Sequence, residues 1–184
     1  MWSLAGDESS LKNSSPNGRF ALRITESSDD GSDEPKIELV EASSGKVMIN
    51  LGTAYRSHLD DTVLIWSADS KWVAYGTRSK KEGGTNVYLW NGSAFNEIAL
   101  PRNMPDPKIA FEKGAEAQLK NFGRAVKPLR WLKSGDLELA NDLTLLSRVD
   151  DRTYKGVVQI TIAFDAKHRA SVHRVGKSKT QIEE

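Results

Sequence analysis

Hydrophobic and polar residues alternate along most of this chain in short runs that polar turns separate. Alternation is the period of a β-strand, whose successive side chains point to opposite faces of a sheet. The pattern comes in a repeated phrase, a polar turn followed by an alternating apolar run. The copies are SPNGRFALRI at Ser15–Ile24, SADSKWVAYG at Ser67–Gly76 and, more weakly, WLKSGDLELA at Trp131–Ala140. Self-similarity of this kind predicts a repeat architecture.

The repeat predicts one all-β domain over residues 15–176, built from three antiparallel meanders of short strands. The second unit has the clearest boundaries, because Asn91-Gly92 is a strong hairpin signal between two strand-like runs. In the third unit, Val157–Phe164 alternates without interruption. We place the units at residues 15–51, 62–101 and 126–175.

One stretch between the second and third units has a helical period instead. Asp106 followed by Pro107 is typical of a helix N-terminus, and Gly123 suits a C-terminus. The apolar residues between them fall on one face of a helix; they are Phe111, Ala115, Leu119 and Phe122. We predict one inserted amphipathic helix over about residues 107–122 that covers part of the sheet.

Both ends of the sequence are polar. We expect residues 1–14 to form a tether of the kind that follows an export signal or lipid anchor, and residues 177–184 to form a frayed tail. The first four residues are too short and polar for a signal peptide. We favour an extracytoplasmic protein, periplasmic or secreted, whose leader is absent from this sequence; a cytoplasmic protein is the alternative.

Composition narrows the class of protein. The chain has 184 residues, 38% hydrophobic and 28% charged, which is typical of a soluble globular domain. No apolar run approaches the roughly 20 residues of a membrane-spanning helix. A net charge of +1 gives no reason to expect a nucleic-acid partner. The absence of cysteine excludes disulfides, thiolate nucleophiles and cysteine-ligated metals.

The repeats resemble those of TolB-like and related, WD-like β-propellers. The recurrent form is a short inner strand ending in Trp-Ser-Pro-Asp-Gly, followed by Lys-x-Leu-Ala-Tyr. Ile65–Tyr75 follows it nearly throughout, and Val87–Trp90 supplies the next strand. Ser15–Leu22 is a second good copy, whereas the copy at Trp131 lacks the Pro-Asp pair. The resemblance covers about three-quarters of the chain. It implies propeller-blade-like units, whose connecting loops are where ligands bind, and by itself it does not establish a function.

Three copies are too few for a closed ring, because propellers typically have about 4–8 blades. The units could instead form an incomplete propeller or a divergent sandwich or barrel. Two chains could complete one ring as a homodimer, or the sequence could be a segment of a larger protein. We favour the compact, divergent all-β domain, because an open stack would leave exposed sheet edges.

We find no catalytic constellation, and we expect no cofactor and no metal. The three histidines lack the spacing of a helical zinc site, and no Gly-x-Ser-x-Gly nucleophile elbow is present. The acidic loop Asp29–Glu34 has oxygen ligands suited to calcium. It lacks the alternating ligand spacing of a calcium-binding helix–loop–helix, so a solvated loop is the better interpretation.

Two places are candidates for binding. The loop between the first two units concentrates Arg56, His58, Asp60 and Asp61, although turn chemistry and surface ion pairs also explain such a cluster. Trp72 follows a turn and Trp90 precedes one, so we expect both to be partly exposed.

Two other tryptophans, Trp66 and Trp131, occupy equivalent repeat positions and are better explained as core. We therefore predict a non-catalytic interaction module that binds a protein partner. The alternative is a small-ligand-binding or hydrolytic domain with a pocket at the 55–61 loop.

Overall fold

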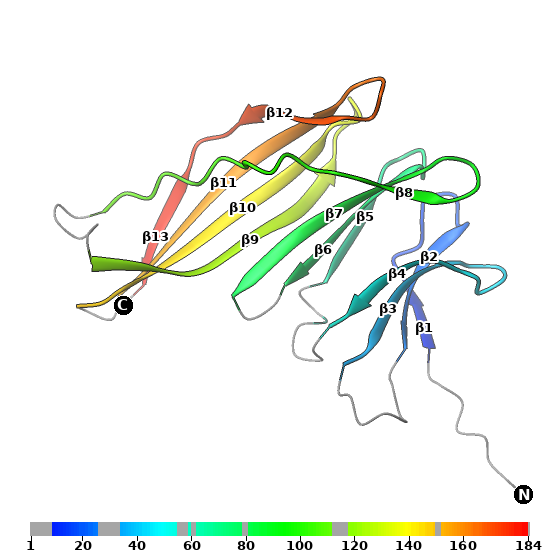
Figure 1. The fold of residues 1–184 in the computed structure, drawn as a ribbon, viewed down its shortest axis with the longest axis horizontal. Coiled ribbons are helices and arrows are strands. Elements are labelled where there is room, and N and C mark those ends of the chain that lie inside the picture. Colours follow the sequence, from blue (N-terminus) through cyan, green and yellow to red (C-terminus); the bar gives the residue numbers. More distant parts are fainter. Residues whose placement is uncertain are drawn as a thin grey trace, which may run out of the picture.

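A computed structural model describes residues 9–25, 34–54, 59, 62–78, 81–111, 118–149 and 152–183. These residues form two β-sheets (Figure 1), which confirms the prediction of an all-β fold. The first sheet is antiparallel, in the order β1-β2-β3-β4. Its strands are β1 (Ser9–Lys12), β2 (Phe20–Thr25), β3 (Lys36–Glu41) and β4 (Val47–Thr53).

The second sheet has nine strands and curls (Figure 1), in the order β12-β11-β10-β9-β7-β6-β5, with β8 paired to β7 and β13 paired to β11. Its first meander contains β5 (Val63–Trp66), β6 (Trp72–Arg78), β7 (Glu82–Trp90) and β8 (Phe95–Ile98). The remaining strands are β9 (Leu119–Trp131), β10 (Leu137–Ser147), β11 (Thr153–Phe164), β12 (Ala170–Val175) and β13 (Lys179–Glu183).

A short parallel contact between β7 and β9 joins the two halves of this sheet. Only two residue pairs form it, Glu82 with Arg124 and Gly83 with Ala125. A Cβ on Gly83 would lie 2.8 Å from the carbonyl oxygen of Thr77 and 2.9 Å from the Ala125 Cβ. Glycine is therefore required at this point, because the Thr77 backbone of β6 and Ala125 of β9 leave no room for a side chain.

The meander β5–β8 is the middle layer of a stack. One hydrophobic cluster joins it to the first sheet, and its members are Phe20, Leu22, Ile37, Leu39, Leu64, Val73, Tyr75 and Tyr88. A second cluster joins it to the last meander, and its members are Ala74, Val87, Leu137, Leu139, Val158, Ile160 and Ile162. Because the neighbours Val73 and Ala74 belong to different clusters, β6 is buried on both faces.

The two outer faces of the stack carry ion pairs. On β2 and β3, Arg23 donates to Glu38 Oε2 from Nε at 2.9 Å and from Nη2 at 2.6 Å. On β9 and β10, Arg130 pairs with Glu138 at 2.8 Å. These residues alternate with core residues and so point away from them. A further sheet on either face, or a ring completed by a second chain, would have to desolvate these charges, which is costly.

The predicted helix over residues 107–122 is wrong at both of its ends. Residues 107–111 are extended, and β9 begins at Leu119; residues 112–117 lie outside the described part. Backbone N–H groups two residues apart, on Lys108 and Ala110, donate to the hydroxyls of Ser178 and Thr180 at 2.8 and 3.2 Å. Asp106 is also held extended by the proline that follows it.

Residues 101–111, here called the strap, cross the face of the last meander (Figure 1). The strap does cover part of the sheet, as the sequence predicts. The buried amide of Asn141 on β10 donates to the Pro105 carbonyl oxygen at 2.8 Å. Phe111 packs edge-on against Tyr154 of β11, with ring centroids 5.6 Å apart. Tertiary contacts thus decide the conformation where the apolar spacing alone indicates a helix.

Two further expectations need correction at the ends of the chain. β1 lies within residues 1–14, the predicted tether, and pairs with β2. β13 lies within residues 177–184, the predicted frayed tail, and pairs with the first half of β11. β12 pairs with the second half of β11, so the two short strands together complete the last meander. Strands β2, β3 and β5 to β8 lie within the first two predicted units, and β4 extends two residues beyond the first.

We predict that Gly76→Ala destabilises the protein whereas Gly84→Ala does not. A Cβ on Gly76 would lie 2.5 Å from Pro128 Cδ, which would force β6 and β9 apart. We expect a loss of about 1–3 kcal/mol in the free energy of unfolding, as for other overpacked sites. Gly84 has no atom within 4 Å of such a Cβ, and its change should be within about 0.5 kcal/mol. Urea unfolding measures both, and equal stabilities would contradict this packing.

Candidate functional site: a tryptophan groove between repeated turns

The same turn occurs four times in the described residues. In each, the fourth residue has a positive φ and its N–H donates to the carbonyl oxygen of the first residue, at 2.8–3.0 Å. The sequence shows three of these turns as repeats, and the fourth follows β11. The bonded pairs are Gly18 with Ser15, Ser70 with Ser67, Gly135 with Leu132, and His168 with Asp165.

Side chains make the first two turns rigid in the same way. Asp69 Oδ1 accepts hydrogen bonds from Ser67 Oγ at 2.6 Å and from the Lys71 N–H at 3.1 Å. Asn17 has the equivalent place in the first turn and accepts from Ser15 Oγ at 2.8 Å and from Arg19 N–H at 3.0 Å. Desolvation opposes ionisation of Asp69, but these two hydrogen bonds together with the Lys71 charge lower its pKa.

Two tryptophans link consecutive layers at equivalent positions. Trp66 Nε1 donates to the Asn13 carbonyl oxygen at 2.9 Å, and Trp131 Nε1 donates to the Ile65 carbonyl oxygen at 3.3 Å. Asn13 and Ile65 each lie two residues before the first residue of a turn. The indole of each later unit is therefore anchored to the same backbone position of the unit before it, and this fixes the orientation of the ring.

Between the second and third turns lies a cavity of about 510 Å³, here called the tryptophan groove. The walls are residues of the two turns, and Trp66, Trp72 and Trp131 line it as well. The Trp72 ring is 5.8 Å from the Trp131 ring and 4.7 Å from that of Phe164, centroid to centroid. All four rings are half-buried, so the aromatic cluster remains open to the groove.

The structure separates Trp72 from Trp90, which the sequence singled out together. Trp72 packs on the second hydrophobic cluster and Trp90 on the first. Trp90 lies 5.0 Å from Phe20 and 5.1 Å from Phe95, with the Arg19 guanidinium 4.9 Å from its ring centroid. Both tryptophans are half-buried, but only Trp72 lines the groove.

The other sequence candidates cannot be placed. Arg56, His58, Asp60 and Asp61 lie outside the described residues, as do all positions of the acidic loop Asp29–Glu34 except the last. Sequence reasoning missed Trp66 and Trp131 as groove residues, because equivalent repeat positions indicated core packing. The signal that could have found them is their position, since each directly precedes one of the repeated turns between which the groove lies.

Titratable and metal-binding chemistry is sparse in the described part of the chain. No group of three or more His, Asp or Glu side chains there is placed to hold a metal ion. Burial raises the pKa of Tyr75 to about 12, so its hydroxyl stays protonated at neutral pH. Among the described residues this hydroxyl has no hydrogen-bond partner, and Tyr75 belongs to the first hydrophobic cluster.

Comparisons with known proteins assign no family to the chain. No family model matches the chain, and no curated protein matches its sequence. Among the described residues there is no helix with the length and hydrophobicity needed to cross a membrane.

We predict that Asp69→Asn preserves the turn at neutral pH and that Asp69→Ala weakens it. Asparagine keeps the accepting oxygen, as Asn17 does in the first turn, whereas alanine removes acceptors for two hydrogen bonds. We expect alanine to cost about 1–2 kcal/mol, measured by urea unfolding. Equal losses for both variants would contradict the role of the accepting oxygen.

The pH dependence gives a second readout on the same variants. Because the folded pKa of Asp69 is below its ordinary value of 3.8, its ionised form stabilises the protein above that pH. This contribution is lost as the pH falls through the lowered pKa. Asp69→Asn does not titrate, so its stability should rise relative to wild type in acid.

Proposed function

We propose that this chain is a non-catalytic, β-propeller-like interaction module that binds an extended segment of a partner protein in the tryptophan groove. The observation that carries the proposal is the gathering of three indoles between two rigid turns of consecutive layers. The propeller-like interpretation is supported by the two four-strand meanders β1–β4 and β5–β8 and by the equivalent hydrogen bonds of Trp66 and Trp131, whereas β9–β13 add five strands to the same sheet as β5–β8.

The chemistry of the groove suits a peptide. Tryptophan offers a large apolar contact area with little loss of side-chain entropy, and it is enriched among residues that dominate protein interfaces. Asp69 and Lys133 stand on opposite walls, on the second and third turns, and give the groove a polar rim. Its volume falls within the range of about 300–1,000 Å³ that is typical of ligand sites.

The groove is also formed before any ligand arrives. The indoles of Trp66 and Trp131 are each held by a backbone carbonyl oxygen, and both walls are hydrogen-bonded turns. Binding would therefore cost little ordering of the protein, which improves affinity for a given contact area.

The alternative function is a small-ligand-binding or hydrolytic domain with a pocket at the 55–61 loop. It rests on the polar composition of that loop, with His58 as the central residue. His58→Ala discriminates between the two functions, since it should abolish activity of the alternative site and leave peptide binding in the groove unchanged.

We predict that peptides selected from a random phage-displayed library on the purified chain lose affinity by at least about tenfold in Trp72→Ala. Ala68→Trp tests the same groove without touching the core, because Ala68 is an exposed turn residue that lines it. Phe122→Ala is the matched control, since this exposed aromatic ring does not line the groove. Titration calorimetry with the synthetic peptides gives the affinities.

The proposal fails if no selected peptide is sensitive to both groove variants. It also fails if the groove instead binds neutral oligosaccharides, which tryptophan rings can equally stack against.

A further inference from the structure

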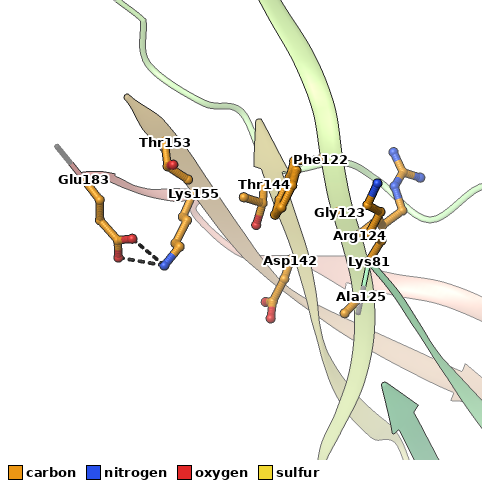
Figure 2. A pocket seen from close by; sticks show the side chains of 10 residues that line it. All are labelled: Lys81, Phe122, Gly123, Arg124, Ala125, Asp142, Thr144, Thr153, Lys155 and Glu183. Carbon is orange, nitrogen blue, oxygen red and sulfur yellow. Dashed lines mark hydrogen bonds and ion pairs between the residues drawn. The ribbon is translucent and has the colours of Figure 1, made fainter. Parts of the chain in front are cut away.

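A second cavity, of about 320 Å³, lies where β9, β10, β11 and β13 extend beyond the junction with β7. We call it the trough. Figure 2 shows the side chains that line it. It faces away from the strap, because Tyr154 contacts the strap and its neighbours Thr153 and Lys155, which line the trough, point to the other side of β11.

The trough is hollow because its floor is made of small residues that the fold requires. The Arg124 N–H donates to the Lys81 carbonyl oxygen at 2.8 Å, which brings the two backbones together. A Cβ on Gly123 would lie 2.9 Å from that oxygen. Gly123 is thus fixed by the junction of β7 and β9, and with Ala125 it leaves a recess between larger side chains.

Most charged side chains of the trough have an ion-pair partner, and Lys81 is the exception in the described part of the chain, since its ammonium group lies over the Phe122 ring. Lys155 Nζ lies 2.6 and 2.7 Å from the two carboxylate oxygens of Glu183, and these side chains are drawn paired in Figure 2. Asp142 pairs with Lys127 at 3.4 Å. A cationic ligand would have to compete with Lys155 or Lys127 for a carboxylate, and an anionic ligand with Glu183 for Lys155, so that only Lys81 could meet an anion without such competition. A neutral polar ligand could add hydrogen bonds to both pairs.

Neutral polar groups and an aromatic ring complete the lining. Thr144 and Thr153 line the trough beside the charged residues. Their hydroxyls have no hydrogen-bond partner among the described residues. Phe122 also lines the trough, and this residue is 42% exposed. Lys81 Nζ lies 5.7 Å from the centroid of that ring, which helps to fix its position.

We propose that the trough binds a neutral sugar unit. The C–H face of a pyranose ring packs on an aromatic ring, and its hydroxyls both donate and accept hydrogen bonds. Phe122 supplies the ring, Asp142 and Glu183 accept, Lys155 donates, and the threonine hydroxyls do either. This site is separate from the tryptophan groove, and the proposal does not depend on peptide binding there.

The test is an NMR titration of the ¹⁵N-labelled chain with methyl glycosides of glucose, galactose, mannose, xylose and N-acetylglucosamine, and with inorganic phosphate. We expect at least one glycoside to shift the amides of Gly123, Thr144 and Lys155 saturably and to leave Ser67–Trp72 unchanged. Phe122→Ala and the isosteric Thr144→Val should each weaken binding by about tenfold, the effect of one good interaction.

Val149→Ala is the matched control, because Val149 is 67% exposed and does not line the trough. The proposal is overturned if no glycoside shifts the trough amides in a chain that gives a folded spectrum. It is also overturned if phosphate shifts them and the glycosides do not, since the trough would then be an anion site. Neither result bears on the groove, whose amides are observed separately.

Discussion

The fold depends on one constraint, which is that the centre of the middle meander, in β6 and the second half of β7, is buried on both faces. Val73 and Tyr75 contact the first sheet, while Ala74 contacts the last meander. A strand of this kind has no solvated face, so it is stable only while a sheet covers each side. The outer sheets need an apolar face only toward the middle layer, and their other faces hold ion pairs such as Arg23 with Glu38.

Features that depend on local sequence could be predicted. The continuous apolar runs Val63–Trp66 and Val87–Trp90 indicate strands, and they are β5 and the end of β7. The turns at Ser15 and Ser67 were equally visible. The helix over residues 107–122 was wrong because distant partners on β10, β11 and β13 hold the strap extended. β13 was missed because its polar sequence becomes a strand only beside β11.

The candidate sites were predictable only in part, because they too depend on contacts between segments that are distant in the sequence. Trp72 was singled out because it follows a turn, but its neighbours in the groove come from a turn more than sixty residues later in the sequence. No local pattern brings Phe122, Lys155 and Glu183 together. They meet because β9, β10, β11 and β13 lie side by side and because glycine is required where β7 meets β9.

Amide hydrogen exchange tests most directly the central claim, which is that β6 is buried between the first sheet and the last meander. We expect the amides of β6 and the second half of β7 to exchange most slowly, since they open only when both outer layers separate. Those of β1, β12 and β13 should exchange much faster. If the amides of Val73–Tyr75 exchanged as fast as those of β12, or if the first sheet were protected independently of β6, the stacked arrangement would be contradicted.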